Sequence, residues 1–339
     1  MADRFAPPPY ALLVLRRLER AGFEAWFVGG CVRDSLLGRA PGDWDVATSA
    51  RPEQVQACFQ GFSTADVGAR HGTILVAVEG HPVEVTTFRR EGGYADGRHP
   101  DEVDFDATLA EDLARRDFTV NAMALDERGM VIDLYGGQLD LFRRLIRCVG
   151  DPDTRFAEDA LRMLRAVRFA AQLGFSIEEG TLAAIRRNAN RAAHLSGERI
   201  KAELEKILLS PRPEKAGDAL GLGLLAHLGG SPDCPDLSPL RDVPAAPIPR
   251  WRAFCRLTGF PITSLPVERS LRRGVLQPEA EAVRELAISG GELAALGLEG
   301  RAIGAVQRRL AAHILAHPED NTREKLLALV SGGQSTETP

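Results

Sequence analysis

The sequence predicts an α+β fold: an N-terminal domain with a mixed sheet, followed by a chain that is helical throughout. Three observations support this prediction. Residues 25–50 alternate short apolar strands with a helix, residues 72–88 read as two strands around a tight turn, and no strand pattern appears beyond residue 137. A length of 339 residues allows two or three domains of ordinary size.

The composition excludes several classes of protein. With 44% hydrophobic and 26% charged residues, it is typical of soluble proteins, and no apolar run is long enough for a membrane span or a signal peptide. The five cysteines are scattered without metal-site spacing, as expected for reduced thiols in the cytoplasm. A net charge of −5 argues against a protein that coats nucleic acid and confines RNA contacts to local clusters. The candidate clusters are Arg143 and Arg144 with Arg147, Arg186 and Arg187 with Arg191, and Arg308 with Arg309.

The stretch AWFVGGCVRDSLLGRAPGDWDVATSA is predicted to form a phosphate-binding turn. Ala25–Val28 reads as a buried strand, and a Gly-Gly pair ending at Gly30 leads into a helix over Cys31–Leu37. Bare glycine backbone and the N–H groups of the first helical turn bind phosphate well. The guanidinium of Arg33 adds donors suited to a triphosphate.

A pair of carboxylates follows this turn. Asp43 and Asp45 are predicted to lie on one face of a second strand, with Trp44 on the other face. Such a pair alone is more typical of a solvated turn, but beside a phosphate cradle it suggests Mg²⁺, which proteins hold by one or two carboxylates and substrate phosphates. We therefore predict Asp43 and Asp45 as catalytic metal ligands in two-metal nucleotidyl transfer. Glu84, on a strand over Pro82–Phe88, is a candidate third ligand or a hydrogen-bonding support for the other two.

The segments GGCVRDSLLGR and DWDVAT together resemble the signature of class II tRNA nucleotidyltransferases (CCA-adding enzymes) and bacterial poly(A) polymerases. This resemblance implies a head of the polymerase-β nucleotidyltransferase type. The later segment RRDFTVNAM, predicted to lie on a helix over residues 112–125, resembles the family's second motif. There the resemblance implies that Arg116 contacts the triphosphate and that Asp117 and Asn121 read the ribose 2′-hydroxyl. Many relatives carry lysine at Gly42, so this departure weakens the expected triphosphate contact slightly.

Residues 155–174 are predicted to form one amphipathic helix whose charged side carries Asp159, Arg162, Arg165 and Arg168. By spacing alone, such a face is typical of a solvated surface. A carboxylate beside a guanidinium, however, complements the amino group and ring nitrogen of cytosine and adenine, and rejects uracil and guanine. The sequence EDALRMLRAVRFAAQLGF also resembles the family's fourth motif. That implies that Asp159 and Arg162 read the base, and that Arg165 and Arg168 support the nucleotide site.

The resemblance also implies a domain order. We expect a catalytic head at 1–137, a helical neck at 138–210, a body at 211–285, a tail at 286–330 that contacts tRNA, and a disordered end at 331–339. The neck segment SGERI resembles a fifth motif, which we interpret as structural bracing. The implied reaction is Mg²⁺-dependent transfer of CMP and AMP from CTP and ATP to the 3′ end of tRNA, with contact to its acceptor arm and no role for a membrane.

Several alternatives share these motifs. Enzymes that add only CC, or only the terminal A, share all of them. A bacterial poly(A) polymerase shares most but usually carries a longer basic extension, and this chain is acidic. A non-catalytic RNA-binding protein is expected to lack one metal carboxylate, and both are present. The sequence does not determine the oligomeric state.

The Gly-rich loop from Glu91 to Asp104 favours complete CCA addition among these alternatives. A reader that accepts C and then A has to shift between steps, and this loop is the candidate that moves it. We expect the loop to hinge at its glycines and to contact the base-reading side chains. The hinge glycines are Gly92, Gly93 and Gly97, and the contacting residues are Asp96 and Arg98. In the family this chain resembles, CC-adding enzymes look shortened here.

Overall fold

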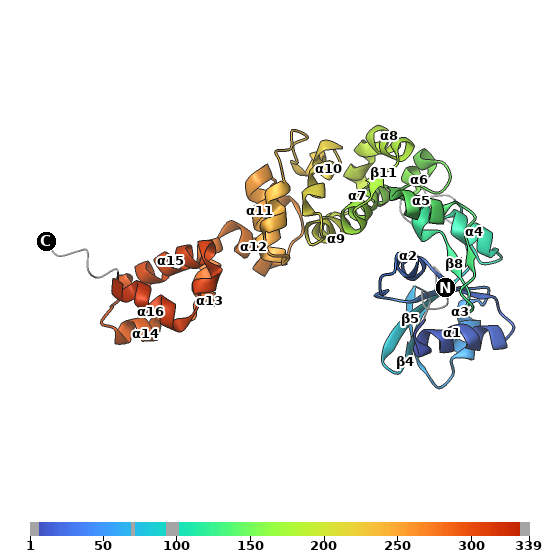
Figure 1. The fold of residues 1–339 in the computed structure, drawn as a ribbon, viewed down its shortest axis with the longest axis horizontal. Coiled ribbons are helices and arrows are strands. Elements are labelled where there is room, and N and C mark those ends of the chain that lie inside the picture. The colour runs from blue at the N-terminus through green and yellow to red at the C-terminus, as the bar shows by residue number, and fades with distance from the viewer. Residues whose placement is uncertain (1–6, 69–71, 93–101, 333–339) are drawn as a thin grey trace.

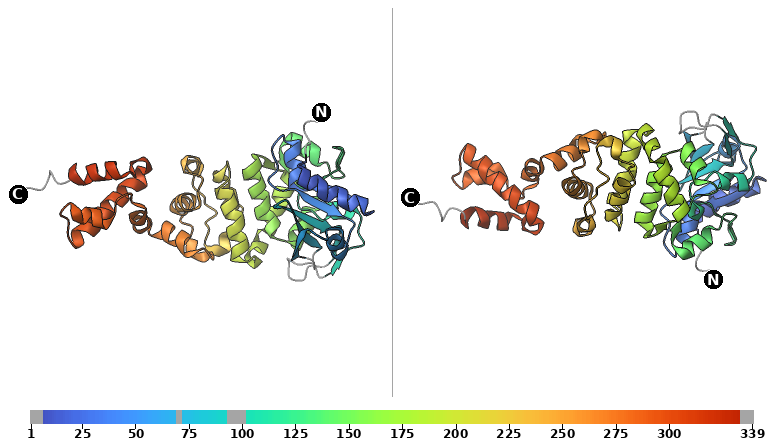
Figure 2. Two further views of the ribbon diagram at one scale, coloured as in Figure 1. Left: turned by 90° about the horizontal axis from the view of Figure 1, so that it is seen from below. Right: turned by 90° about the horizontal axis from the view of Figure 1, so that it is seen from above.

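The computed structural model describes residues 7–68, 72–92 and 102–332. The chain forms an elongated arc with a mixed α/β head at one end and helices along the rest (Figure 1). The head and the C-terminal helices lie at opposite ends of this arc in every view (Figure 2). The predicted order of an α+β head followed by helices is confirmed.

One seven-stranded mixed sheet forms the centre of the head. Its strands are β1 (Ala25–Val28), β2 (Asp45–Thr48), β3 (Ser63–Gly68), β4 (Thr73–Val78), β5 (His81–Thr87), β8 (Ala124–Leu125) and β9 (Val131–Ile132). The spatial order is β3-β4-β5-β2-β1-β8-β9. β2 and β5 run parallel, and the other neighbouring pairs run antiparallel. The sequence analysis missed β3.

Helices cover both faces of this sheet. The helices of the head are α1 (Pro9–Arg20), α2 (Gly30–Leu36), α3 (Pro52–Cys58) and α4 (Leu109–Ala114). Successive strand residues point to opposite faces. Phe27 and Val46 accordingly join the main core together with side chains of α1 and α3, whereas Val28 and Ala47 join a smaller cluster with α4. Asp45 and Glu84 alternate with residues of the main core, so they lie on the α4 side of the sheet.

The rest of the chain is helical apart from a short parallel pair, β10 (Leu145–Ile146) and β11 (Ser176–Ile177). Its α-helices are α5 (Gly137–Arg143), α6 (Pro152–Glu158), α7 (Leu161–Leu173), α8 (Glu179–Asn188), α9 (Gly197–Leu208), α10 (Ala216–Gly221), α11 (Pro247–Thr258), α12 (Arg269–Leu276), α13 (Pro278–Glu285), α14 (Gly290–Ala295), α15 (Arg301–Ala316) and α16 (Arg323–Gly332). Short 3₁₀ helices connect them at 189–194, 213–215, 226–228, 238–242, 262–264 and 318–320. Among the described residues, no helix has the length and apolar character needed to span a bilayer.

Two separate hydrophobic cores run along the arc. The first is continuous from Leu15 in α1 to Leu271 in α12, so the head and the following helices share it. The second is enclosed by α13–α16 and includes Leu293 and Leu310. Ala282, which precedes the expected start of the tail at residue 286, also belongs to the second core. The domain boundaries stay a prediction.

The helix predicted over residues 112–125 is wrong. α4 ends at Ala114, Phe118 is extended and pairs with Cys148, and a 3₁₀ helix, η3 (Thr119–Asn121), follows before β8. Backbone hydrogen bonds to residues 147–149 hold this segment extended. Tertiary pairing therefore overrides the local preference for helix.

The single helix predicted over residues 155–174 is also wrong. It is broken at Asp159, whose backbone is extended at φ −149° and ψ 106°. The Asp159 carboxylate accepts a hydrogen bond from the N–H of Leu161 at 3.0 Å, which caps the start of α7. Apolar side chains on both sides of the break are buried, Phe156 before it and Leu164 after it, so the hydrophobic pattern does not reveal the break.

Three smaller expectations also need correction. The strand predicted over Met130–Tyr135 is reduced to the two residues of β9. The predicted loop begins and ends in paired strands, β6 (Arg90–Gly92) and β7 (Glu102–Asp104). Its expected hinge and contact residues Gly93, Asp96, Gly97 and Arg98 lie outside the described residues. The disorder expected over residues 331–339 is wrong for residues 331 and 332, because α16 extends to Gly332. Residues 333–339 lie outside the described part.

Gly137 begins α5 at a position with no room for a side chain. A Cβ there would lie 2.3 Å from the carbonyl oxygen of Thr119 and 2.9 Å from Sδ of Met123. Because the first of these atoms belongs to the backbone, we predict that Gly137→Ala lowers the free energy of unfolding by about 1–3 kcal/mol, measured by urea denaturation. Gly221→Ala, at the end of α10 with nothing within 4 Å, is the control and should be neutral or slightly stabilising. Equal stability of the two variants would contradict this packing.

Candidate active site

A cavity of about 560 Å³ lies where the head meets α7 and α9. Every predicted site residue except Asp43 lines it, namely Gly30, Arg33, Asp45, Glu84, Arg116, Asp117, Asn121, Asp159, Arg162, Arg165 and Arg168. A larger cavity of about 890 Å³ lies among α9, α11, α12, α13 and α15, but it contains none of the predicted site residues. The smaller cavity is therefore the candidate active site.

The turn between β1 and α2 lies at one end of the cavity. Gly29 has φ 76° and ψ −129°, a conformation that favours glycine. A Cβ at Gly29 would lie 3.3 Å from Nη1 of Arg116 and 4.0 Å from Oδ2 of Asp45. The turn, a guanidinium and a carboxylate thus converge on one point. Nε of Arg116 is buried and has no hydrogen-bond partner within the described residues, which leaves a donor available beside the turn.

At the end of the cavity near the glycine turn, the pKa of Asp45 is shifted by its surroundings. Burial raises its pKa, the negative charges of Glu84 and Asp43 raise it further, and Arg116 opposes them, so that the pKa is about 6. Burial and the neighbouring negative charges disfavour the ionised form of Asp45, and a divalent cation would offset both effects. The residues present therefore fit a metal ion.

Asp43 is placed differently from the prediction. β2 begins at Asp45, because the ladder with β1 ends at the pair Val28–Asp45 and the chain turns away at Gly29. Asp43 is exposed and precedes the strand, while Trp44 is buried as the predicted alternation requires. The prediction that both aspartates lie on one strand is therefore wrong, because Asp45 is the first residue of β2 and Asp43 precedes it.

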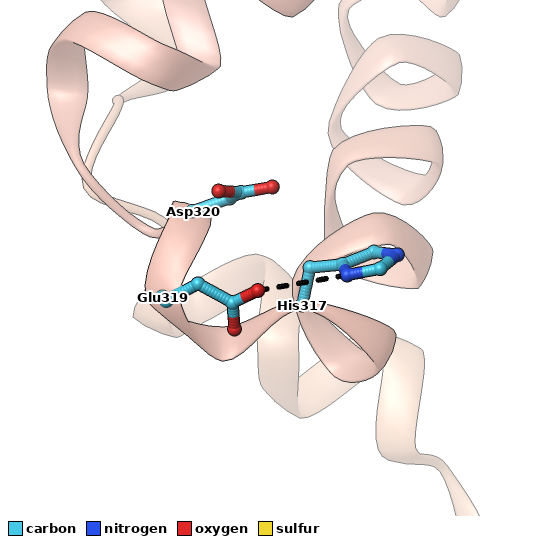
Figure 3. Close-up of side chains that lie close together, drawn as sticks. All are labelled: His317, Glu319 and Asp320. Atoms are coloured by element: carbon cyan, nitrogen blue, oxygen red, sulfur yellow. Dashed lines mark ion pairs between the residues drawn. The ribbon is translucent and has the colours of Figure 1, made fainter.

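A different group of ligand-type side chains lies near the C-terminus. Among the described residues, only His317, Glu319 and Asp320 form a group of three with ligand atoms within 4.8 Å of one another (Figure 3). The His317 ring lies 3.6 Å from the Glu319 carboxylate, and Asp320 already pairs with Lys325 at 2.8 Å and His313 at 2.7 Å. These contacts balance the charges within the turn after α15, so we interpret the group as a structural turn.

A chain of hydrogen bonds crosses the cavity from the head to α7. Nη1 of Arg33 donates to Oδ1 of Asn121 at 2.7 Å, and Nδ2 of Asn121 donates to Oδ1 of Asp117 at 3.3 Å. Oδ2 of Asp117 accepts from Nε of Arg165 at 2.8 Å and lies 2.6 Å from its Nη2. Burial alone would raise the pKa of Asp117, but the charge of Arg165 and these hydrogen bonds outweigh burial and lower it.

Asp117 and Asn121 contact each other directly, whereas Arg116, which a continuous helix over residues 112–125 would have placed within reach of both, has a different partner. Nη2 of Arg116 instead donates to Asp112 at 3.1 Å. The reason is the end of α4 at Ala114, since Asp112 and Arg116 lie one helical turn apart and Asp117 follows in the extended segment.

The predicted pair of Asp159 and Arg162 is also not formed. Arg162 donates to the Glu158 carboxylate at 2.5 Å and to the carbonyl oxygen of Arg115 at 3.2 Å. Asp159 accepts from Nη1 and Nη2 of Arg199 in α9, at 3.1 and 2.7 Å. The two residues stay one turn apart in the backbone, where Arg162 N–H donates to the carbonyl oxygen of Asp159 at 3.1 Å, but their side chains have different partners. Both still line the cavity.

The residues that line the cavity and that sequence reasoning did not name as site residues include Arg89, Arg115, Phe169 and Arg199. The Phe169 ring is surrounded by the guanidinium carbons of Arg33, Arg165 and Arg168 at 5.4, 5.5 and 4.1 Å. Cations over an aromatic face are attracted by its quadrupole. For Arg199 a signal was present, because it belongs to the segment SGERI that we interpreted only as bracing.

The cavity carries an excess of positive charge. Eight arginines line it against four carboxylates, Asp45, Glu84, Asp117 and Asp159. Arginine provides planar donors that suit phosphate oxygens. The cavity is therefore suited to a polyanion that has its phosphates near the glycine turn.

Comparison with known proteins supports this interpretation. Residues 25–147 match the family described as "Poly A polymerase head domain", and residues 174–229 match the one described as "Probable RNA and SrmB- binding site of polymerase A". The crystal structure of the Bacillus stearothermophilus CCA-adding enzyme in complex with CTP is 32% identical with a TM-score of 0.64, over 97% of this chain and 99% of that one. The chain belongs to the family of CCA-adding enzymes and poly(A) polymerases.

Curated relatives in this family are closer in sequence. The CCA-adding enzyme of Geobacillus kaustophilus (strain HTA426) is 54% identical over 226 residues, which is 66% of this chain and 55% of that protein. The CCA-adding enzyme of Geobacillus thermodenitrificans (strain NG80-2) is 50% identical over 265 residues, or 74% of this chain and 64% of that protein. The chain thus matches between 55% and 64% of the length of these two relatives. Membership of the family implies a divalent metal ion.

The Asp117–Arg165 pair generates a prediction about pH. The folded-state pKa of Asp117 is lowered, so the stability it contributes is present above its unfolded pKa of about 3.9 and is lost as the pH falls through the folded value. We predict that Asp117→Asn is less stable than the wild type at pH 7 and pH 5, and that this difference shrinks below about pH 4. Urea denaturation at several pH values measures the difference, and a difference that stays constant down to pH 3 would contradict the ion pair.

Proposed function

We propose that this chain adds CMP and AMP to the 3′ end of tRNA, using CTP and ATP without a nucleic-acid template. The observation that carries the proposal is that the glycine turn, the carboxylates Asp45 and Glu84, and the side chains of Asp159 and Arg162 all line one cavity. The likeness to CCA-adding enzymes, one of them solved in complex with CTP, supports it.

The triphosphate is proposed to bind at the turn. The N–H of Gly30 and the guanidiniums of Arg33 and Arg116 are the donors, since Arg116 approaches the turn and keeps a buried donor without a partner. Because the metal carboxylates lie at the same end, the α-phosphate is expected between the turn and Asp45. The 3′-hydroxyl of tRNA then enters from the open side of the cavity.

Asp43 and Asp45 are proposed to hold Mg²⁺, with Glu84 as the candidate third ligand. When bound, Mg²⁺ supplies Lewis-acid stabilisation of the attacking and leaving oxygens. The chain itself holds the carboxylates close enough for Glu84 and Asp43 to raise the pKa of Asp45, and it places Arg116 beside them. Arg116 thereby links the carboxylate cluster to the triphosphate.

Asp117 and Asn121 are proposed to read the ribose. Both oxygens of Asp117 already accept two contacts each, from Phe118 N–H, Asn121 and Arg165. Asn121 keeps one amide hydrogen and one lone pair beyond its bonds to Asp117 and Arg33. We therefore assign the contact with the 2′-hydroxyl to Asn121 and the orientation of its amide to Asp117.

The base is proposed to lie against Asp159 and Arg162. The carboxylate accepts from the amino group of cytosine or adenine, and the guanidinium donates to the ring nitrogen. Arg165 and Arg168 support this end of the cavity through Phe169, and Arg168 also lies 2.6 Å from Glu203 of α9.

The helical part of the chain is proposed to hold tRNA. The neck, body and tail, at 138–210, 211–285 and 286–330, extend from the cavity along the arc (Figure 1). Exposed arginines on α5 and α8, including Arg143 and Arg186, are candidates for phosphate contacts. A cytoplasmic location is part of the proposal, and it agrees with the five free cysteines.

Primer extension tests the proposed function. Transfer RNA transcripts that end in the discriminator base, in C, or in CC are incubated with each single NTP and with CTP plus ATP. With CTP, we expect two C additions on the transcript that ends in the discriminator base and one on the transcript that ends in C. With ATP, we expect one A addition on the transcript that ends in CC. A protein that stops at CC with ATP present would be a partial enzyme, and one that extends any RNA with A would be a poly(A) polymerase.

Asp45→Asn tests the assignment of the metal ligands. We predict that this variant loses turnover by several orders of magnitude, because metal ions supply several kcal/mol of transition-state stabilisation, while its affinity for tRNA stays within about twofold. Glu53→Gln, on the exposed side of α3 away from the cavity, is the control and should keep full activity. Substantial AMP incorporation by Asp45→Asn at saturating Mg²⁺ would exclude Asp45 as a ligand.

A further inference from the structure

Asp159 is held on two sides at the base-reading end of the cavity. Oδ1 accepts from Leu161 N–H at 3.0 Å and from Nη1 of Arg199 at 3.1 Å, and Oδ2 accepts from Nη2 of Arg199 at 2.7 Å. Asp159 and Arg199 are only 18% and 21% exposed. A two-point pair of this kind fixes the plane of a carboxylate as well as its position.

Counting acceptor positions shows what this arrangement leaves for a ligand. An ionised carboxylate offers about four lone-pair positions. The contacts with Leu161 and Arg199 occupy both positions on Oδ1 and one on Oδ2. Within the part of the chain that the structure describes, a single acceptor position on Oδ2 remains. Cytosine and adenine each carry a single amino group on the edge in question, so donor and acceptor match in number.

The ion pair between Asp159 and Arg199 also affects which carboxylate Arg162 pairs with. Arg162 is the arginine closest to Asp159 in the sequence, and a direct pair between the two would use the groups that are proposed to contact the base. Glu158 instead holds Arg162 at 2.5 Å, while Arg199 holds Asp159. Each member of the reading pair thus has its own counter-charge, and the two stay apart.

Helix α9 supports α7 at a second point. Glu203, one turn after Arg199, lies 2.6 Å from Nε of Arg168, and its side chain is only 5% exposed. Arg199 and Glu203 therefore face the cavity side of α7 together. These two contacts fix α9 relative to the base-reading end of the cavity. An arginine on a flexible loop would not be held in place in this way.

We propose that Arg199 is a positioning residue that sets base specificity: it keeps Asp159 away from Arg162 and leaves it one acceptor position, placed for the amino group of cytosine or adenine. This inference rests on the proposed function and goes beyond it, because Arg199 acts on the base through Asp159 without needing to touch it. Uracil and guanine present a carbonyl oxygen to that position, where two acceptors oppose each other.

The test compares nucleotide selectivity in Arg199→Ala, Arg199→Lys and the wild type. The ratio of kcat/KM for CTP over UTP is measured on tRNA ending in the discriminator base, and that for ATP over GTP on tRNA ending in CC. We expect Arg199→Ala to lower both ratios by at least about tenfold, since Asp159 is then able to pair with Arg162. Arg199→Lys, which keeps the charge but loses the two-point geometry, should fall between.

A double variant separates positioning from general damage. If Arg199 acts through Asp159, adding Arg199→Ala to Asp159→Ala changes the selectivity ratios no further. Arg16→Ala is the matched control, because it removes a surface arginine from its 2.7 Å pair with Glu127 in the head and should leave both ratios unchanged. Thermal unfolding verifies that the variants fold, and if Arg199→Ala does not, Arg199→Lys decides.

The outcomes distinguish this inference from the proposed function. A wild type without preference for CTP and ATP would overturn the proposed function itself. A selective wild type together with a folded Arg199→Ala that keeps its ratios would overturn only the role of Arg199. A folded Arg199→Ala variant that is equally slow with all four nucleotides would also overturn the role of Arg199 in specificity, because it would show that Arg199 only stabilises the cavity.

Discussion

The ion pair between Asp117 and Arg165 is the contact on which the cavity depends. Asp117 belongs to the extended segment after α4, and Arg165 belongs to α7, so the pair joins the head to the first long helix of the arc. Through Asn121 the same network reaches Arg33 beside the glycine turn. The network thereby holds the glycine turn of the head and helix α7 at a fixed separation across the cavity.

The electrostatics of the cavity follow from how its arginines are paired. Most of them already have a carboxylate, such as Asp112 for Arg115 and Arg116, or Glu158 for Arg162. Pairing orients each guanidinium and reduces repulsion among neighbours, while the remaining N–H groups stay available for a ligand. Asp45 shows the opposite condition, since burial, together with the negative charges of Glu84 and Asp43, raises its pKa to about 6. One end of the cavity is thus suited to phosphate and the adjacent cluster to a cation.

The sequence was most informative where the function is encoded locally. The strand, glycine turn and helix of residues 25–36 could be predicted, because apolar periodicity and Gly29 act over a few residues. The break at Asp159 could not, because the apolar pattern continues across it and the cause is one side-chain hydrogen bond. The pairing of Asp159 with Arg199 joins residues 40 positions apart, so no local spacing predicts it.

A crystal structure of the protein with CTP and Mg²⁺ tests the central claim most directly. The claim is that one cavity binds the whole nucleotide, with its phosphates at the glycine turn and its base at α7. We predict density for the triphosphate beside Gly30 and Arg116 and for the cytosine amino group on Oδ2 of Asp159, with Arg199 still bound to that carboxylate. A nucleotide whose base lies away from Asp159, or whose phosphates lie away from the glycine turn, would contradict the account.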